Sequence, residues 1–374
     1  MALLTKKQVF KIENFAFEYG PTIPVEIGYE TFGTLNAAKD NVILVSHYFS
    51  ATSHCAGKYA ETDELAGYWD GLIGPGKAVD TNKYFVISTD NLCNCAVKSS
   101  FVHTTGPYSV NPATGKRYAL SFPVPTVTDI VHTQKALLES LGISHLKAAM
   151  GASAGGIISY EWAVHYPQWV DVIIPVIATP VHPSFTSFIS LQHAIRAAKL
   201  DPKWHGGNYY NEAEQPDESL YLALQIMTVG AFSAPYLERT YKRNSADVDC
   251  YKDVLAFSTV EDQLYKLQVE RSALVDLNHW IYTCRIFMNH DISRHFGGNL
   301  DEALSRIKAR VLAVPCRSDL MHPAEFVKWT VDRINWLGGN AELYVIDSDV
   351  GHMAGILQPQ LFDSKIKDFL GRYC

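Results

Sequence analysis

The most constraining stretch of the chain is residues 146–156, LKAAMGASAGG, where a short apolar run meets the pattern Gly-x-Ser-x-Gly around Ser153. A helical pattern follows at once, over residues 157–165. A serine between a strand and a helix indicates a sharp, strained turn, which only tiny neighbouring residues allow. The turn places Ser153 at a helix N-terminus, where backbone N–H groups favour developing negative charge. The alternative is a small-residue turn whose serine merely caps the helix.

The rest of the chain alternates strand and helix patterns around this turn. After two alternating segments at 10–13 and 25–30, continuous apolar runs are typical of strands buried on both faces. A helical pattern at 129–141 is closed by Gly142. This alternation predicts an α/β fold with a mostly parallel sheet and helices on both faces. The predicted buried strands are 42–46, 84–88, 146–150, 170–176, 311–315 and 341–346.

The alternation stops between residues 184 and 304. Helical spacing dominates there, at 187–199, 219–232 and 261–290. We therefore predict a core formed by residues 1–183 and 305–374, with residues 184–304 inserted as a helical lid. In open α/β sheets the site lies beyond the carboxyl ends of the strands, which is where such an insertion would cover it. The alternative is a helical subdomain that only adds core.

Bulk properties exclude several classes of function. The chain has 374 residues and a net charge of −7 without a block of Lys or Arg, which argues against a nucleic-acid partner. No apolar run approaches the roughly 18 residues of a membrane span, and the N-terminus lacks the apolar region of a signal peptide. Seven cysteines, an odd number, predict free thiols in a cytoplasmic protein. Cys93 and Cys95 lack a second metal-spaced pair, so we expect no metal and no cofactor.

A serine hydroxyl needs a base to act as a nucleophile, normally a histidine oriented by a carboxylate. Asp319 follows the predicted strand 311–315, and His352 follows the strand 341–346. Both hang from carboxyl ends of strands, as Ser153 does, and the order Ser, Asp, His is the one expected on this fold. We predict a Ser153, Asp319 and His352 triad. Asp347 and Asp349 compete for the role of the acid, but their closeness in sequence to His352 argues that they shape its loop. His322 competes for the role of the base, but it lies equally close in sequence to Asp319.

Acyl transfer also needs N–H donors aimed at the oxyanion. One predicted donor is the backbone N–H of Ala154. The other should come from the loop 47–51 after a buried strand; Phe49 is our choice, with one residue either way left open. The alternative for this loop is a plain turn with buried aromatic residues.

The chain resembles the homoserine O-acetyltransferase family of α/β-hydrolases over nearly its whole length. The resemblance rests on several motifs, of which WDGLIGPGK at 69–77 is the most specific. It implies the triad above, a helical lid that also makes a homodimer contact, and a ping-pong mechanism through an acetyl-enzyme. The remaining motifs are GYETFG at 28–33, Asp80, NP at 111–112, TGK at 114–116, and the elbow with EWA at 161–163 and YP at 166–167.

Departures from the family pattern bear on the substrate. Ala152 and Ala154 flank the serine where the family usually has Gly and Met, and Ser99, Ser100 and 104–106 alter a glycine-rich segment. Members that use homoserine carry Asp after the catalytic histidine, where this chain has Met353, and an arginine on a lid helix, where Gln225 is the nearest match. A zwitterionic substrate buried without charged partners would lose several kcal/mol of binding free energy, whereas a small neutral ester would lose none.

The sequence therefore favours hydrolysis of short-chain, acetyl esters through an acyl-enzyme, with Tyr48, Gln225 and Met353 as candidate substrate-binding residues. The partner is then a small-molecule ester. The alternative is transfer of acetyl to the hydroxyl of L-homoserine, with acetyl-CoA as co-substrate. A third possibility, a binding protein on a catalytically dead fold, is disfavoured because the triad is complete in sequence.

Overall fold

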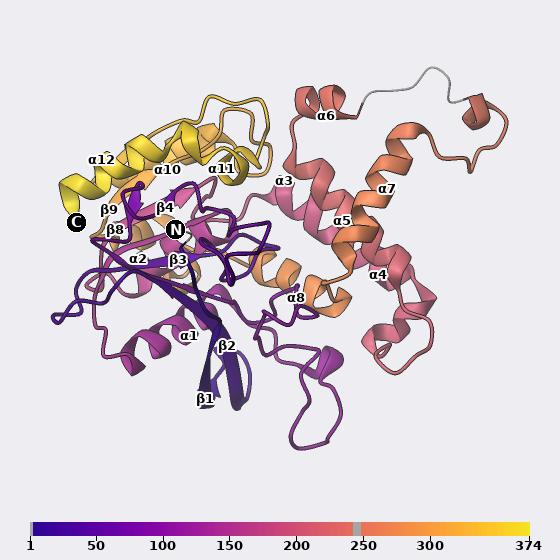
Figure 1. The fold of residues 1–374 in the computed structure, drawn as a ribbon, viewed down its shortest axis with the longest axis horizontal. Coiled ribbons are helices and arrows are strands. Elements are labelled where there is room, and N and C mark those ends of the chain that lie inside the picture. The colour runs from indigo at the N-terminus through magenta and orange to yellow at the C-terminus, as the bar shows by residue number, and fades with distance from the viewer. Residues whose placement is uncertain (1–2, 242–247) are drawn as a thin grey trace.

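The computed structural model describes residues 3–241 and 248–374, and its centre is a sheet of eight strands (Figure 1). Their order is β1-β2-β6-β3-β7-β8-β9-β10. β1 and β2 pair antiparallel, β2 pairs antiparallel with β6, and the others run parallel. The prediction of a mostly parallel sheet is confirmed. The strands are β1 Gln8–Ala16, β2 Thr22–Phe32, β3 Val42–Ser46, β6 Phe85–Thr89, β7 Leu146–Ala152, β8 Val170–Val176, β9 Arg310–Ala313 and β10 Ala341–Leu343, with a separate pair β4 Ile73–Gly74 and β5 Val79–Asp80.

Alternate residues of the central strands supply two separate hydrophobic cores. In β3, Val42 and Leu44 belong to one core, whereas Ile43 and Val45 belong to the other. The first core holds apolar residues of α1 (Val127–Ser140), α2 (Ala154–His165) and α10 (Ala324–Trp336), and the second holds those of α12 (Asp363–Tyr373). Since successive side chains of a strand point to opposite faces, the sheet is covered by helices on both sides.

The boundaries of several elements differ from the predicted ones. α1 starts at Val127, two residues earlier, because Thr126 and Asp129 form a capping box. α2 starts at Ala154 rather than at 157, since the helix begins directly after the strained serine. β10 ends at Leu343 instead of 346. Beyond it, the Tyr344 N–H still donates to the Ala313 carbonyl oxygen, and Ile346 forms an isolated bridge with Cys316.

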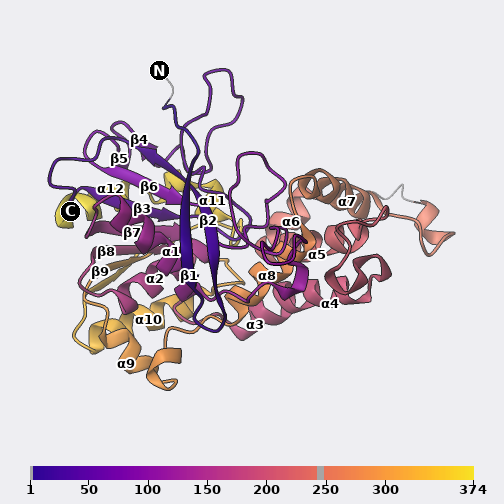
Figure 2. The ribbon, with the colours of Figure 1, turned by 90° about the horizontal axis from the view of Figure 1, so that it is seen from below.

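The helices between β8 and β9 lie mostly to one side of the sheet (Figures 1 and 2). The predicted helical segment 261–290 is two helices, because the Asp276 carboxylate accepts from the His279 N–H and starts a new helix. α9 packs against α10, so the end of this region returns to the core (Figure 2). The limits 184 and 304 of the lid stay predictions. The helices are α3 Ser184–Thr186, a π-helix Ser187–Gln192, α4 His193–Leu200, α5 Asp217–Ala231, α6 Ala234–Thr240, α7 Thr259–Ser272, α8 Leu277–Met288 and α9 Leu300–Ser305.

In the described part of the chain, no helix combines the length and the apolar character that crossing a bilayer requires. All seven cysteines are free thiols, as predicted. Cys93 and Cys95 are both buried in the first core, and burial raises the pKa of each thiol.

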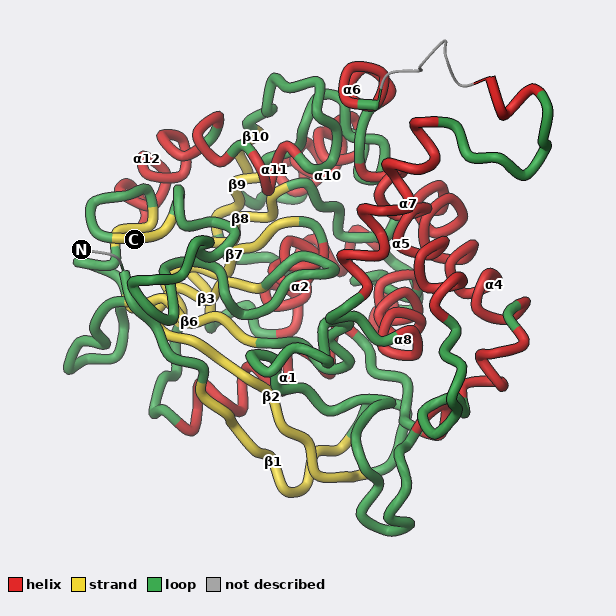
Figure 3. Tube along the Cα trace, turned by 45° about the vertical axis from the view of Figure 1, so that its right-hand side comes forward, coloured by secondary structure: helices red, strands yellow, loops and turns green. Residues whose placement is uncertain are grey.

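His279 joins α8 to the segments that follow β6 (Figure 3 shows α8 among the inserted helices, to one side of the strands). Its Nδ1 lies 2.9 Å from the Asn94 carbonyl oxygen, and its Nε2 accepts from the Tyr108 N–H at 3.0 Å. The ring is completely buried, and burial lowers its pKa below the usual 6.5. If Nε2 were protonated, it could no longer accept the hydrogen bond from the Tyr108 N–H, because it would itself be a donor. The folded protein therefore requires His279 to be neutral.

This requirement predicts a pH-dependent stability. Below pH 6.5 the unfolded chain binds a proton at His279 that the folded protein excludes, so stability falls as the pH is lowered. Each pH unit below that point costs at most about 1.4 kcal/mol through this group. We expect His279→Gln, whose amide does not titrate, to lose less thermal stability than the wild type between pH 7.5 and about pH 5.5. Equal losses of melting temperature in the two proteins would contradict this role.

Candidate active site

Ser153 occupies the strained turn that its sequence pattern predicts. It lies between β7 and α2 with φ 53° and ψ −116°, in the left-handed region that a residue with a side chain rarely adopts. The turn is tight because β3 passes close behind it. A Cβ at Gly155 would lie 2.0 Å from the Ser46 carbonyl oxygen, and one at Gly151 would lie 2.4 Å from the same atom. Both glycines are therefore required by contact with the neighbouring strand.

The structure brings the three predicted triad residues into one hydrogen-bonded row. The Ser153 Oγ lies 2.8 Å from His352 Nε2, and His352 Nδ1 lies 2.8 Å from Asp319 Oδ2. Ser153, Asp319 and His352 are all buried. These distances are those of a serine activated by a histidine that a carboxylate orients.

The Asp319 carboxylate is held by its own loop, and the loop of His352 is tied to the same segment. Asp319 Oδ1 accepts from the backbone N–H groups of Met321, at 2.7 Å, and His322, at 3.0 Å. This leaves Oδ2 for the histidine. Gly351, directly before His352, has φ 91° and donates its N–H to Ser318 Oγ at 3.0 Å.

The residues that compete for these roles in the sequence lie elsewhere. Asp347 accepts from Arg317 at the surface, and Asp349 pairs with Arg239. His322 Nδ1 lies 2.8 Å from Thr179 Oγ1, with its ring 5.5 Å from that of His352. Burial lowers the pKa of His322 far below its ordinary value, so this neighbour adds no positive charge beside the imidazole of His352.

The two predicted oxyanion residues, Phe49 and Ala154, line the same cavity as Ser153. The loop that carries Phe49 is fixed by His47, whose Nδ1 lies 2.7 Å from the Tyr48 carbonyl oxygen and whose Nε2 accepts from the Asn91 N–H. Among the described residues, the N–H groups of Tyr48, Phe49 and Ser50 have no acceptor. Each is free to face an oxyanion, so the choice of Phe49 over its neighbours stays a prediction.

The cavity above Ser153 has a volume of about 520 Å³ and is lined mainly by apolar side chains from both core and lid. Two of the candidate substrate-binding residues, Tyr48 and Met353, line it. The third, Gln225, does not: it faces a separate cavity of about 460 Å³ formed by α3, the π-helix and α5. The placement of Gln225 among the substrate contacts is therefore not supported, because α5 turns this residue away from Ser153.

Arg271 on α7 lines the Ser153 cavity, and the sequence reasoning missed it. Beside it, Glu270 also reaches the cavity. A signal for Arg271 is present in the chain, because it follows Leu264 and Leu267 at the spacing of an apolar stripe on one face of α7. A lone arginine in such a stripe points to a buried anion or a polar cavity.

No protein-family model matches the chain. The homoserine O-acetyltransferase of Deferribacter desulfuricans is 35% identical over 370 residues, covering 98% of this chain and 95% of that protein. The enzyme of the same name from Moorella thermoacetica is 37% identical over 349 residues, which cover 92% of this chain and 90% of that protein. The chain belongs to the homoserine O-acetyltransferase family.

Solved structures from this family and its neighbours have the same fold. The homoserine O-acetyltransferase of Bacillus anthracis is 49% identical, with a TM-score of 0.96 over 99% of this chain and 98% of that one. Esterase E22 is 36% identical, with a TM-score of 0.94 over 98% of this chain and all of that one. The α/β-hydrolase fold is thus confirmed. A member of the homoserine O-acetyltransferase family with these neighbours is an enzyme, either an acyltransferase or an ester hydrolase.

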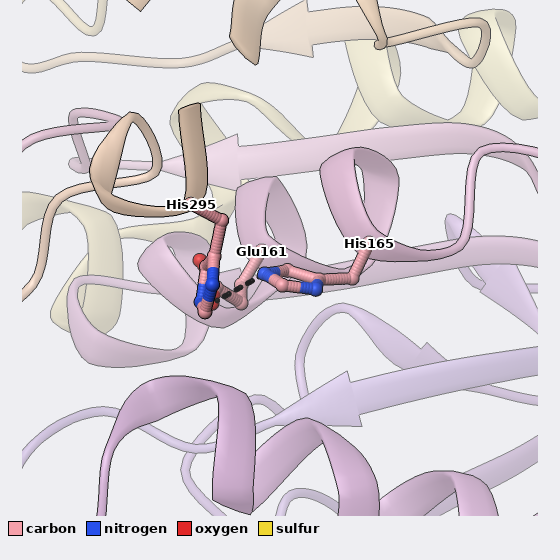
Figure 4. Close-up of side chains that lie close together, drawn as sticks. All are labelled: Glu161, His165 and His295. Carbon is pink, nitrogen blue, oxygen red and sulfur yellow. Dashed lines mark ion pairs between the residues drawn. The ribbon is translucent and has the colours of Figure 1, made fainter. Parts of the chain in front are cut away.

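Away from this site, Glu161, His165 and His295 form a cluster with the composition of a metal site (Figure 4). Their ligand atoms lie within 4.8 Å of one another. Arg294, however, places its guanidinium 3.0 Å from His295 Nε2 and also pairs with Glu18. A cation bound to His295 would have to displace this positive charge. The cluster fits an ion-pair network, and the prediction of no metal stays a prediction.

The close contact behind the elbow generates a mutational test. We expect Gly155→Ala to lower the melting temperature and abolish turnover of p-nitrophenyl acetate, because its Cβ would lie 2.0 Å from a backbone oxygen of β3. Forcing α2 away costs about 1–3 kcal/mol and displaces Ser153. The matched control is Gly371→Ala on α12, where nothing lies within 4 Å of the added Cβ. Full activity in Gly155→Ala would show that the contact does not set the site.

Proposed function

We propose that this protein transfers an acetyl group from acetyl-CoA to the hydroxyl of L-homoserine through an acetyl-enzyme on Ser153. The observation that carries the proposal is the hydrogen-bonded row of Ser153, His352 and Asp319 inside a cavity that Arg271 and Glu270 also line. The names of the curated relatives favour the same acceptor. The sequence favours hydrolysis because Met353 and Gln225 replace charged anchors. That argument weakens, since Gln225 lies outside the cavity and two other charged side chains lie within it.

The geometry supports a reaction in two halves. His352 Nε2 removes the proton of Ser153 Oγ as this oxygen attacks the thioester carbonyl, while Asp319 holds the imidazole by its Nδ1. The N–H groups of Ala154 and Phe49 stabilise the oxyanion. His352 then protonates the thiolate that leaves. In the second half, the acceptor hydroxyl gives its proton to His352 and attacks the acetyl carbonyl. The bond to Ser153 Oγ then breaks, and His352 returns the proton to this oxygen.

The test measures the release of CoA from acetyl-CoA by purified protein, with and without L-homoserine. We expect homoserine to accelerate release and to yield O-acetylhomoserine. Ser153→Ala should lower the rate by a factor of about 10⁴ or more while the melting temperature changes little, because the nucleophile is lost and the cavity remains. CoA release unaffected by homoserine would refute the acceptor, and retained activity in Ser153→Ala would refute the nucleophile.

Ester hydrolysis is the second candidate, and Met353 is the observation that favours it. Met353 follows the catalytic histidine and lines the cavity with an apolar side chain, which suits a neutral ester. Esterase E22 is a structural neighbour at 36% identity. In this reaction water replaces the acceptor, and the steps up to the acetyl-enzyme are the same.

Met353→Asp separates the two candidates, with Met353→Leu as the matched control. If transfer is the activity, a carboxylate beside His352 gives the homoserine ammonium a partner, and kcat/KM for homoserine rises several-fold. If hydrolysis is the activity, the new charge disfavours neutral esters, so kcat/KM for ethyl acetate falls and homoserine has no effect. Rates with both substrates in all three proteins decide between these outcomes.

We infer further that the protein is a homodimer through its lid and resides in the cytoplasm. The second cavity supports the dimer, because apolar side chains around it are exposed, among them Phe185, Leu222 and Val229. The free cysteines support a reducing compartment.

A further inference from the structure

We propose that Arg271 forms an anion-binding subsite in the Ser153 cavity and that this subsite takes the carboxylate of the substrate. The inference deepens the proposed function and rests on it for the acceptor, but it holds for any acyl group or alcohol that carries a carboxylate. It gives α7 a role in substrate selection, and the sequence pattern of the triad does not predict this role.

The guanidinium of Arg271 is held in place by neutral groups. Its Nη1 donates to Thr228 Oγ1 of α5 at 2.6 Å and to Gln268 Oε1 of α7 at 3.2 Å. The side chains of Thr228 and Gln268 are both buried. One nitrogen thus makes both contacts, and it ties the arginine to two helices of the lid.

The other edge of the guanidinium is free. Within residues 3–241 and 248–374, no hydrogen-bond acceptor is found for its Nε or Nη2, and no carboxylate lies within ion-pair distance of Arg271. These two nitrogens form the planar fork that binds a carboxylate with two parallel hydrogen bonds. The side chain is therefore suited to bind an anion, because one nitrogen is anchored and the other two are unpaired in a residue that lines the cavity.

Other arginines of the chain show what Arg271 lacks. Arg239, Arg317 and Arg333 each contact an aspartate at the surface. Arg271 is half-buried in a mainly apolar cavity, where burial lowers its pKa although the side chain stays charged. A charge taken from water without an opposite partner is costly, so a ligand that supplies a negative charge here gains a strong interaction.

The surroundings narrow the class of anion. Among the described residues that line the cavity, Glu270 is the other side chain with a formal charge besides the histidines, and it is exposed. A carboxylate at Arg271 and an ammonium group at Glu270 would be complementary to an α-amino acid. The phosphates of CoA are the other anions that transfer would bring to this cavity, and the experiment separates them from a substrate carboxylate.

The experiment uses two acetyl esters that differ in one charge, 4-acetoxybutanoate and its neutral amide 4-acetoxybutanamide. Deacetylation of each ester is followed in the wild type, in Arg271→Gln and in the control variant Arg333→Gln. Arg333 lies on α10, outside the lid. We expect Arg271→Gln to lower kcat/KM for the carboxylate by about 100-fold, mainly through KM, because two charge-assisted hydrogen bonds are lost. The amide should lose far less, and Arg333→Gln should behave as the wild type. Equal losses on both esters, or no loss on either, would overturn the proposal.

A second arm varies the acceptor and the acetyl donor. With homoserine against 3-amino-1-propanol, which lacks the carboxylate, the Arg271→Gln loss should appear with homoserine alone. If instead the loss follows the donor, appearing with acetyl-CoA and vanishing with p-nitrophenyl acetate, Arg271 binds CoA phosphate and the proposal is wrong. Should homoserine accept no acetyl group even in the wild type, the proposed function fails, and the ester pair still decides the role of Arg271.

Discussion

The close approach of β3 to the start of α2 is the constraint on which the site depends. The Ser46 carbonyl oxygen lies where a Cβ of either Gly151 or Gly155 would have to be, so strand, turn and helix meet at van der Waals contact. In this tight turn Ser153 adopts a positive φ, and this backbone conformation turns its hydroxyl out of the sheet. The same geometry puts the hydroxyl above the first N–H groups of α2, where negative charge is favoured. The position of the Ser153 hydroxyl thus depends on a backbone packing that no larger residue permits.

Around that fixed point, the other groups are placed by loops that leave parallel strands at the same edge of the sheet. The loop after β9 carries Asp319, and the loop beyond β10 carries His352. The loop after β3 carries Phe49, whose ring packs against Trp280 of α8 at 4.9 Å. α8 in turn holds the core through His279. The inserted helices therefore do more than cover the site, since one of them buttresses the loop predicted to bind the oxyanion.

Local patterns were enough to predict the sheet and the meeting of Ser153, Asp319 and His352 at one edge of it, because strand hydrophobicity and the positions of strand ends are properties of short segments. The strained turn at Ser153 is visible in the sequence for the same reason. Gln225 and Arg271 show where this reasoning stops. Which residues of a lid helix face the site depends on how the helix is rotated against its neighbours, and the motifs of the core carry no information on that. The start of a new helix, α8, after Asp276 is also absent from the prediction, since a single side-chain cap divides the segment 261–290, whose helical pattern is continuous.

The difference between a hydrolase and a transferase on this fold then reduces to the charges in a mainly apolar cavity. The triad serves water and alcohols alike, and its distances do not discriminate between them. An apolar wall such as Met353 favours neutral groups, whereas an arginine with one open edge favours an anion, and in a cavity of low polarity each effect is larger than in water. Because Arg271 Nη1 contacts Thr228 of α5 and Gln268 of α7, the position of the guanidinium depends on how these two helices pack together. Substrate choice and the packing of the lid over Ser153 would then depend on the same guanidinium.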